Sequence, residues 1–192
     1  MKKSLLKKVL VGFAAIIVIL VIVIATRDPE CRIQRSITIN APANAAYALV
    51  SDFHQWGNWS PWEKVDPGMK RTFSEKAAGT GATYYWVGNN DVGEGKMTML
   101  QCDEPNKVVI QLDFIKPMAA TNTATFTFDK QTDGTKVTWL MEGKKNFIAK
   151  AFSMFVNVDK MVGSQFETGL TAMKQAAEKS VVDSAQPAVG MK

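Results

Sequence analysis

The sequence predicts an α+β domain in which a seven-stranded antiparallel sheet curls around a long C-terminal helix, preceded by one N-terminal transmembrane helix. Three observations carry this prediction. Residues 9–25 are uninterruptedly apolar, a series of strand patterns separated by turn signals follows, and the last segment has apolar residues at helical spacing. Only that last segment is long enough to cover the apolar face of such a sheet.

The first segment has the length and flanking charge of a membrane anchor. A helix counted from Leu5 is about 31 Å long, close to a hydrocarbon core of about 30 Å. Lysines precede it and no acid does, so the positive-inside rule predicts a cytoplasmic N-terminus and an extracytoplasmic domain, periplasmic if the cell is Gram-negative. A cleaved signal is the alternative, but the apolar run exceeds the usual h-region of about 7 to 15 residues and has no Ala-x-Ala site.

The net charge of +5 belongs to the N-terminus, where Lys2, Lys3, Lys7, Lys8 and Arg27 account for all of it. The rest of the chain is neutral, so it lacks the basic surface of a nucleic-acid-binding protein. One histidine and two distant cysteines offer no metal-ligand spacing, and no glycine-rich phosphate loop opens a helix. We therefore expect no nucleic acid, metal or cofactor; the oligomeric state stays open.

The elements of the domain follow in order from residue 31. Residues 31–40 alternate between apolar and polar side chains, which predicts a half-buried strand. Pro42 suits the first turn of a short helix that ends near Asp52, and a second helix or tight turn must contain residues 54–62. Turn signals and short connections then predict an antiparallel run of strands. These six strands are expected at residues 69–74, 82–87, 96–102, 107–115, 119–128 and 135–142.

Residues 147–180 carry apolar side chains at intervals of three and four, which predicts one long amphipathic helix with Asn157 or Gly163 as a kink. Residues 181–192 are rich in Ser, Ala, Pro and Gly and are expected to be disordered. The predicted organisation is an N-terminus and anchor at 1–27, a domain at 28–180 and a tail at 181–192.

Four motifs carry a family resemblance. They are Ile37-Thr-Ile-Asn-Ala-Pro42, Trp56-Gly-Asn-Trp-Ser-Pro-Trp62 followed by Asp66-Pro67, Val92-Gly-Glu-Gly95, and Asp159-Lys-Met-Val-Gly163 with Phe166-Glu-Thr-Gly-Leu170. With these motifs, residues 33–178 resemble the START and Bet v 1-like (SRPBCC) superfamily, and within it the polyketide cyclase/dehydrase and lipid transport group. The resemblance implies a helix-grip fold with an internal apolar cavity that binds a hydrophobic small molecule or lipid.

Aromatic and methionine side chains that share strand faces or the tryptophan-rich turn are the predicted cavity lining, because such walls adapt to irregular apolar ligands. The same residues also fill ordinary cores, with indole N–H groups bonded to the backbone, so that alternative stays open. The predicted ligand-binding residues are Trp56, Trp59, Trp62, Tyr84, Trp86, Met97, Met99, Phe114, Phe126, Phe128, Trp139, Met141 and Phe152.

Arg35 is a further predicted ligand-binding residue. It shares its strand face with Ile33 and Ile37, so it points toward the apolar side of the first strand. A charge placed there needs a partner. Either a carboxylate of the protein or the head group of an acidic ligand would serve.

Four residues are weak candidates for catalysis. Asp52, Glu94 and Glu142 stand near predicted cavity edges and could act as general acids if burial raised their pKa, while His54 is the only histidine and more simply a surface residue. The sequence thus favours a membrane-tethered binding protein. The alternatives are a cyclase- or dehydratase-like enzyme that uses the same cavity, and a protein-interaction module with a filled core.

Overall fold

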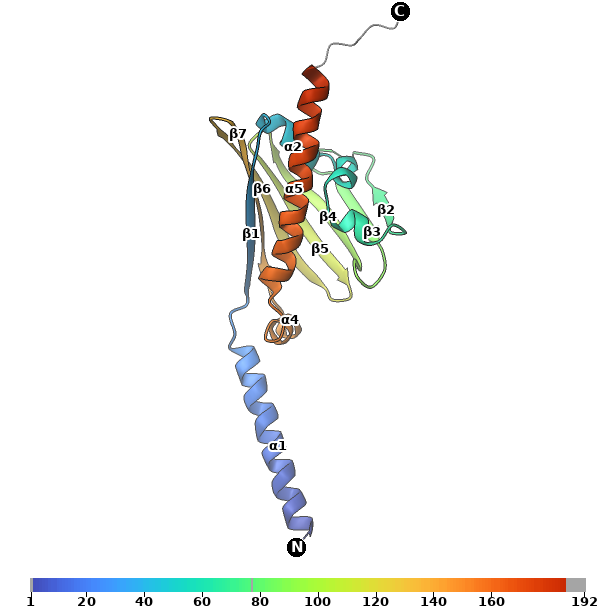
Figure 1. The fold of residues 1–192 in the computed structure, drawn as a ribbon. Coiled ribbons are helices and arrows are strands. Elements are labelled where there is room, and N and C mark those ends of the chain that lie inside the picture. Colours follow the sequence, from blue (N-terminus) through green and yellow to red (C-terminus); the bar gives the residue numbers. More distant parts are fainter. Residues whose placement is uncertain (1, 77, 186–192) are drawn as a thin grey trace, which may run out of the picture.

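The structure, a computed structural model, describes residues 2–76 and 78–185. A sheet curves around helix α5 (Val158–Ala185), and helix α1 (Lys2–Ala25) projects from one end of this domain (Figure 1). Helix α1 is exposed along nearly its whole length. Within the described ranges, it is the one helix that is long and apolar enough to cross a membrane.

The sheet has seven strands, each paired antiparallel with its neighbours in the order β1-β7-β6-β5-β4-β3-β2. All the predicted strands are present and differ from prediction only at their ends, so the predicted fold class is confirmed. The first strand pairs with the last because the helical segment after it carries the chain across to the far edge. The strands are β1 (Glu30–Ile39), β2 (Lys70–Phe73), β3 (Thr83–Val87), β4 (Glu94–Asp103), β5 (Lys107–Lys116), β6 (Ala120–Gln131) and β7 (Gly134–Lys144).

Three short helices connect β1 to β2. Helix α2 (Ala43–Ser51) follows Pro42, and the 3₁₀ helix η1 (Phe53–Asn58) is capped by the Asp52 carboxylate, which accepts a 2.9 Å hydrogen bond from the His54 backbone N–H. Helix α3 (Trp62–Val65) completes the predicted turn. Helix α2 covers one end of the concave face of the sheet, and η1 and α3 lie on the side of β2 and β3 (Figure 1).

The prediction of one continuous helix over residues 147–180 is wrong. Helix α4 (Phe147–Phe152) ends first, and α5 starts afresh at Val158. Asn157, expected as a kink, instead begins the second helix, because its side-chain oxygen accepts a 2.9 Å bond from the Lys160 N–H. Gly163 lies inside α5 without interrupting it. The helix also continues to Ala185, beyond the predicted boundary at residue 180; the rest of the predicted tail, 186–192, lies outside the described residues.

One hydrophobic core lies between the concave face of the sheet, α2, η1 and α5. Its largest fully buried side chains include Trp59, Phe53, Phe126 and Phe166. Within the described ranges, the core includes no residue of α1. The domain therefore has a core of its own, independent of the N-terminal helix.

Candidate functional site

A cavity of about 360 Å³ lies between the sheet and the first half of α5, and it is partly open to solvent. Alternate residues of β3 to β7 point into it because successive side chains of a strand face opposite sides of the sheet. Its walls are predominantly apolar. Among the predicted ligand-binding residues, the lining includes Trp56, Trp62, Tyr84, Trp86, Met97, Phe114, Trp139 and Met141.

Four other predicted residues are buried in the core instead of lining the cavity: Trp59, Met99, Phe126 and Phe128. Trp59 packs between other rings, with its centroid 4.7 Å from that of Trp56, and its indole N–H donates to the Leu49 carbonyl at 2.8 Å. Phe128 lies edge-on to Tyr47 of α2 at 5.8 Å. These four residues therefore fit the alternative that the sequence left open, in which they fill an ordinary core.

Phe152 is placed outside the cavity. It is the last residue of α4, is 46% exposed and does not contribute to the lining. The reason is the break before α5, which separates α4 from the helical face that packs against the sheet. Had the helix been continuous, Phe152 would have shared that face with Phe166 and Leu170.

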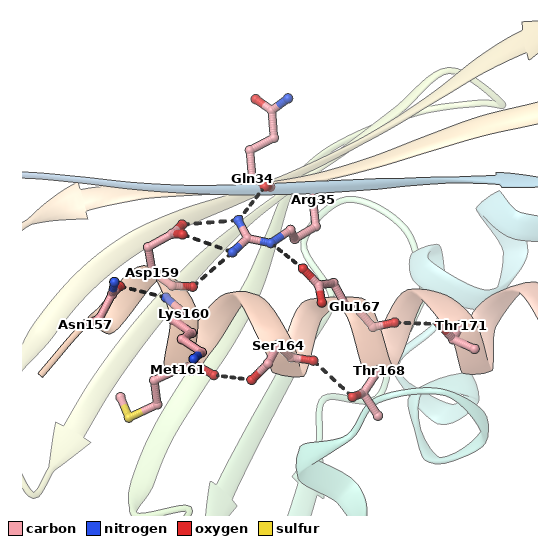
Figure 2. Close-up of polar contacts among 10 residues, drawn as sticks. All are labelled: Gln34, Arg35, Asn157, Asp159, Lys160, Met161, Ser164, Glu167, Thr168 and Thr171. Atoms are coloured by element: carbon pink, nitrogen blue, oxygen red, sulfur yellow. Dashed lines mark hydrogen bonds and ion pairs between the residues drawn. The ribbon is translucent and has the colours of Figure 1, made fainter.

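Arg35 does lie on the concave face, opposite Trp139 of β7, but it is engaged by two acids of α5 and is not part of the cavity lining. Figure 2 shows its guanidinium held by Asp159 and Glu167. Nη1 and Nη2 donate to the two Asp159 carboxylate oxygens at 3.1 and 3.0 Å, and Nε donates to Glu167 at 2.8 Å. The bonds to Arg35 lower the pKa of Asp159, and the bonds to both acids raise the pKa of Arg35. We call these three residues the Arg35 cluster.

Gly163 makes room for this cluster. A Cβ on Gly163 would lie 2.0 Å from Nη2 of Arg35, so the guanidinium occupies the space above the helix that any side chain would fill. This packing explains a glycine inside an unbroken helix, where it otherwise weakens helix formation. The family motif that contains Asp159 and Gly163 thus attaches α5 to β1.

Glu94 belongs to the outer face of the sheet. One of its oxygens accepts from the Tyr85 hydroxyl, and the other pairs with Lys116 Nζ at 2.6 Å. These bonds, first that to Lys116 and then that to Tyr85, lower the pKa of Glu94. A general acid at neutral pH needs the opposite shift, so this environment does not prepare Glu94 to donate a proton.

The other candidates for catalysis also lie away from the cavity lining. His54 is largely exposed; its ring packs on Phe73 at 4.5 Å, and its Nδ1 lies 3.2 Å from Asp52 Oδ1. Glu142 forms an exposed ion pair with Arg32 at 2.6 Å. Sequence position alone placed these residues near cavity edges, whereas strand register and the η1 turn point them outward.

A charged cluster at the cavity wall was not predicted from the sequence. Glu63 of α3 accepts from the Tyr84 hydroxyl at 2.6 Å and pairs with Arg71 Nε at 2.6 Å, and its side chain is only 9% exposed. Burial, followed by the bond to Glu63, raises the pKa of Tyr84. Met69, Met161 and other lining residues were also missed, because they meet only when α3, β2 and α5 come together. No local pattern marks such long-range partners.

The cavity wall also contains an unsatisfied donor. Trp139 is 3% exposed and lies face to face with Phe166 at a centroid distance of 3.9 Å. Its Nε1 is buried without a hydrogen-bond partner, the one such side-chain nitrogen or oxygen in the described part of the chain. Trp56, Trp59 and Trp86, in contrast, donate to backbone carbonyls. An unpaired buried donor is costly, and because this nitrogen is buried it is not exposed to the cavity.

Residues 30–178 match the family described as polyketide cyclase / dehydrase and lipid transport. The chain belongs to this family. Membership agrees with the predicted resemblance and with an apolar cavity under a sheet that curls around a helix. Comparison with curated proteins gives no match.

Solved structures of low sequence identity share the fold of this family member. The di-domain ARO/CYC StfQ from the steffimycin biosynthetic pathway aligns with a TM-score of 0.61 at 11% identity, over 81% of this chain and 53% of StfQ. A Chromobacterium violaceum protein aligns with a TM-score of 0.57 at 14% identity, over 77% of this chain and 96% of its own. The Aha1 dimer from Colwellia psychrerythraea gives 0.56 at 16% identity, over 77% and 96%.

Proposed function

We propose that this protein is a membrane-tethered binding protein that holds one hydrophobic small molecule or single-chain lipid in its cavity. The observation that carries the proposal is the cavity itself, whose walls are predominantly apolar side chains. Burying apolar ligand surface supplies about 25 cal/mol per Å².

The size of the cavity narrows the ligand class. About 360 Å³ is near the lower end of the range of about 300–1,000 Å³ that small-molecule sites occupy. A single acyl chain, a fatty ketone or a compact polycyclic molecule suits this volume better than a two-chain phospholipid does. Four methionines in the wall, Met69, Met97, Met141 and Met161, would let it adapt to the ligand.

The tether is part of the proposal. The exposed apolar helix α1 supports a membrane anchor, and the lysines before it support a cytoplasmic N-terminus with the domain on the other side. A cleaved signal sequence would also begin with such a helix. Sequencing the N-terminus of the protein purified from membranes separates the two, since an anchor leaves residues 1–25 in place.

The test of binding is ligand retention by the full chain in lipid nanodiscs, where detergent cannot occupy the cavity. Native mass spectrometry should show one bound small molecule per chain, and added fatty ketones or fatty acids should displace a fluorescent fatty-acid probe. No bound molecule and no uptake of the probe would contradict the proposal. The hollow interior already counts against the alternative of an interaction module with a filled core.

A further inference from the structure

The end of the domain next to α1 carries exposed apolar side chains. Phe147, Ile148 and Phe152 lie on α4 and Phe155 lies in the turn after it; we call these four residues the α4 patch. Phe155 is 86% exposed and Ile148 is 61% exposed. Large apolar side chains so concentrated on one short segment typically mark an interaction surface.

The α4 patch lies at the depth where α1 ends. Figure 1 places α4 between the end of α1 and the sheet. The Lys150 Nζ donates to the carbonyl of Ala25, the last residue of α1, at 3.1 Å, and the Lys145 N–H donates to the Pro29 carbonyl at 2.7 Å. Since α1 is apolar up to Ala25, a bilayer that surrounds α1 would have its surface at this level.

The charges around the α4 patch suit the same partner. Lys144, Lys145 and Lys150 precede or lie within α4, and Lys160 follows it in the first turn of α5. The nearest acid on these helices, Asp159, is already paired with Arg35. Apolar side chains flanked by lysines are the composition of segments that lie in the interface of a membrane, with their apolar face about 5–10 Å deep.

We propose that the α4 patch embeds in the bilayer surface beside the anchor and so turns the cavity opening toward lipid. Met161, which is half-exposed, and Val162 line the cavity one to two turns beyond Phe155, and Asp91 and Val92 line it from the β3–β4 connection. The partner is therefore the lipid surface itself. This inference rests on the proposed membrane anchor.

The experiment uses the full chain in phosphatidylcholine vesicles that contain phosphatidylglycerol. Cys31→Ser and Cys102→Ser remove the native thiols, and a nitroxide is attached at Phe155→Cys, at Ile148→Cys or, as the control, at Asp133→Cys in the β6–β7 turn at the opposite end of the domain. Labels on the patch should collide with oxygen more than with a water-soluble nickel complex. The control label should show the reverse order.

The outcomes separate this inference from the proposed function. If both patch labels meet the nickel complex as freely as the control does, in chains that resist alkaline extraction, the inference is wrong and the anchor stands. If alkali extracts the chain, both fail. If the patch labels are embedded but no ligand is retained, this inference holds and the proposed ligand binding fails.

Discussion

The inside of the domain has a filled end and a hollow end, built from the same kinds of side chain. At the filled end, Tyr47 and Val50 of α2 pack against the sheet with Phe126, Phe128 and Met173. At the hollow end, Trp86, Phe114 and Met141 face the cavity. The difference lies in what covers them: α2 and the later turns of α5 at one end, and α3 with the first turns of α5 at the other.

Helix α5 is held to the sheet in different ways over the two ends. Where apolar contacts are many, Phe166, Leu170 and Met173 hold the helix to the core. In its first turns, beside the cavity, the Arg35 cluster attaches it to β1 instead. Ion pairs thus act where the cavity leaves little apolar surface to bury.

A substitution at the filled end should cause the greatest loss of stability. Phe126→Ala should lower the free energy of unfolding by about 3–5 kcal/mol, because it leaves a void in a packed core. Phe114→Ala, at the half-buried cavity wall, should cost less than half of that. Urea denaturation measures both. Equal losses would mean that the two ends are packed alike.

Filling the hollow end should weaken ligand binding and leave the fold intact. Ala124 of β6 lines the cavity between Ile110 and Met141, so Ala124→Phe places a ring in the ligand space. We expect at least about a tenfold loss of affinity, which corresponds to about 1.4 kcal/mol. Fluorescent-probe titration measures it. Thr125→Phe, on the opposite face of the same strand, is the control and should bind normally.

Gly163→Ala tests the attachment of α5 over the cavity. Alanine favours a helix over glycine by about 1 kcal/mol, yet the new methyl group would meet the Arg35 guanidinium. We expect no net gain in unfolding free energy, because making room for the methyl group costs the exposed ion pairs of Arg35 with Asp159 and Glu167, whose loss offsets the helix gain. Gly57→Ala, where a Cβ meets nothing within 4 Å, is the control. A stabilised Gly163→Ala variant would show that the contact is not tight.

The smallest effect is the pH dependence of the Arg35 cluster. The pKa of Asp159 in the folded protein lies below its ordinary value of 3.8, so its stabilising contribution is complete above that value and is lost as the pH falls through the folded pKa. Asp159→Asn should therefore lower stability slightly at pH 7, and the difference from the parent should shrink toward pH 3. Urea denaturation at both pH values measures it. A difference that grows in acid would reverse the assignment.

Much of the fold was predictable because its signals are local. Strand alternation, turn residues and the apolar run of α1 each depend on neighbours in the sequence, and each predicted strand is present. The break between α4 and α5 was missed because apolar spacing continues across it, while the capping by Asn157 that starts α5 is a weaker signal.

Strand alternation alone predicts that aromatic and methionine faces line the inside of a curled sheet, and that Arg35 points inward and needs a partner. Which of those faces stay open depends on how the elements pack together. Trp59 and Trp62 stand three residues apart in one motif, yet one is core and the other lines the cavity. A void forms where elements far apart in the sequence leave space between them. Here α2 covers one end of the sheet and the start of α5 covers the other, and no single segment encodes how closely these elements approach the strands.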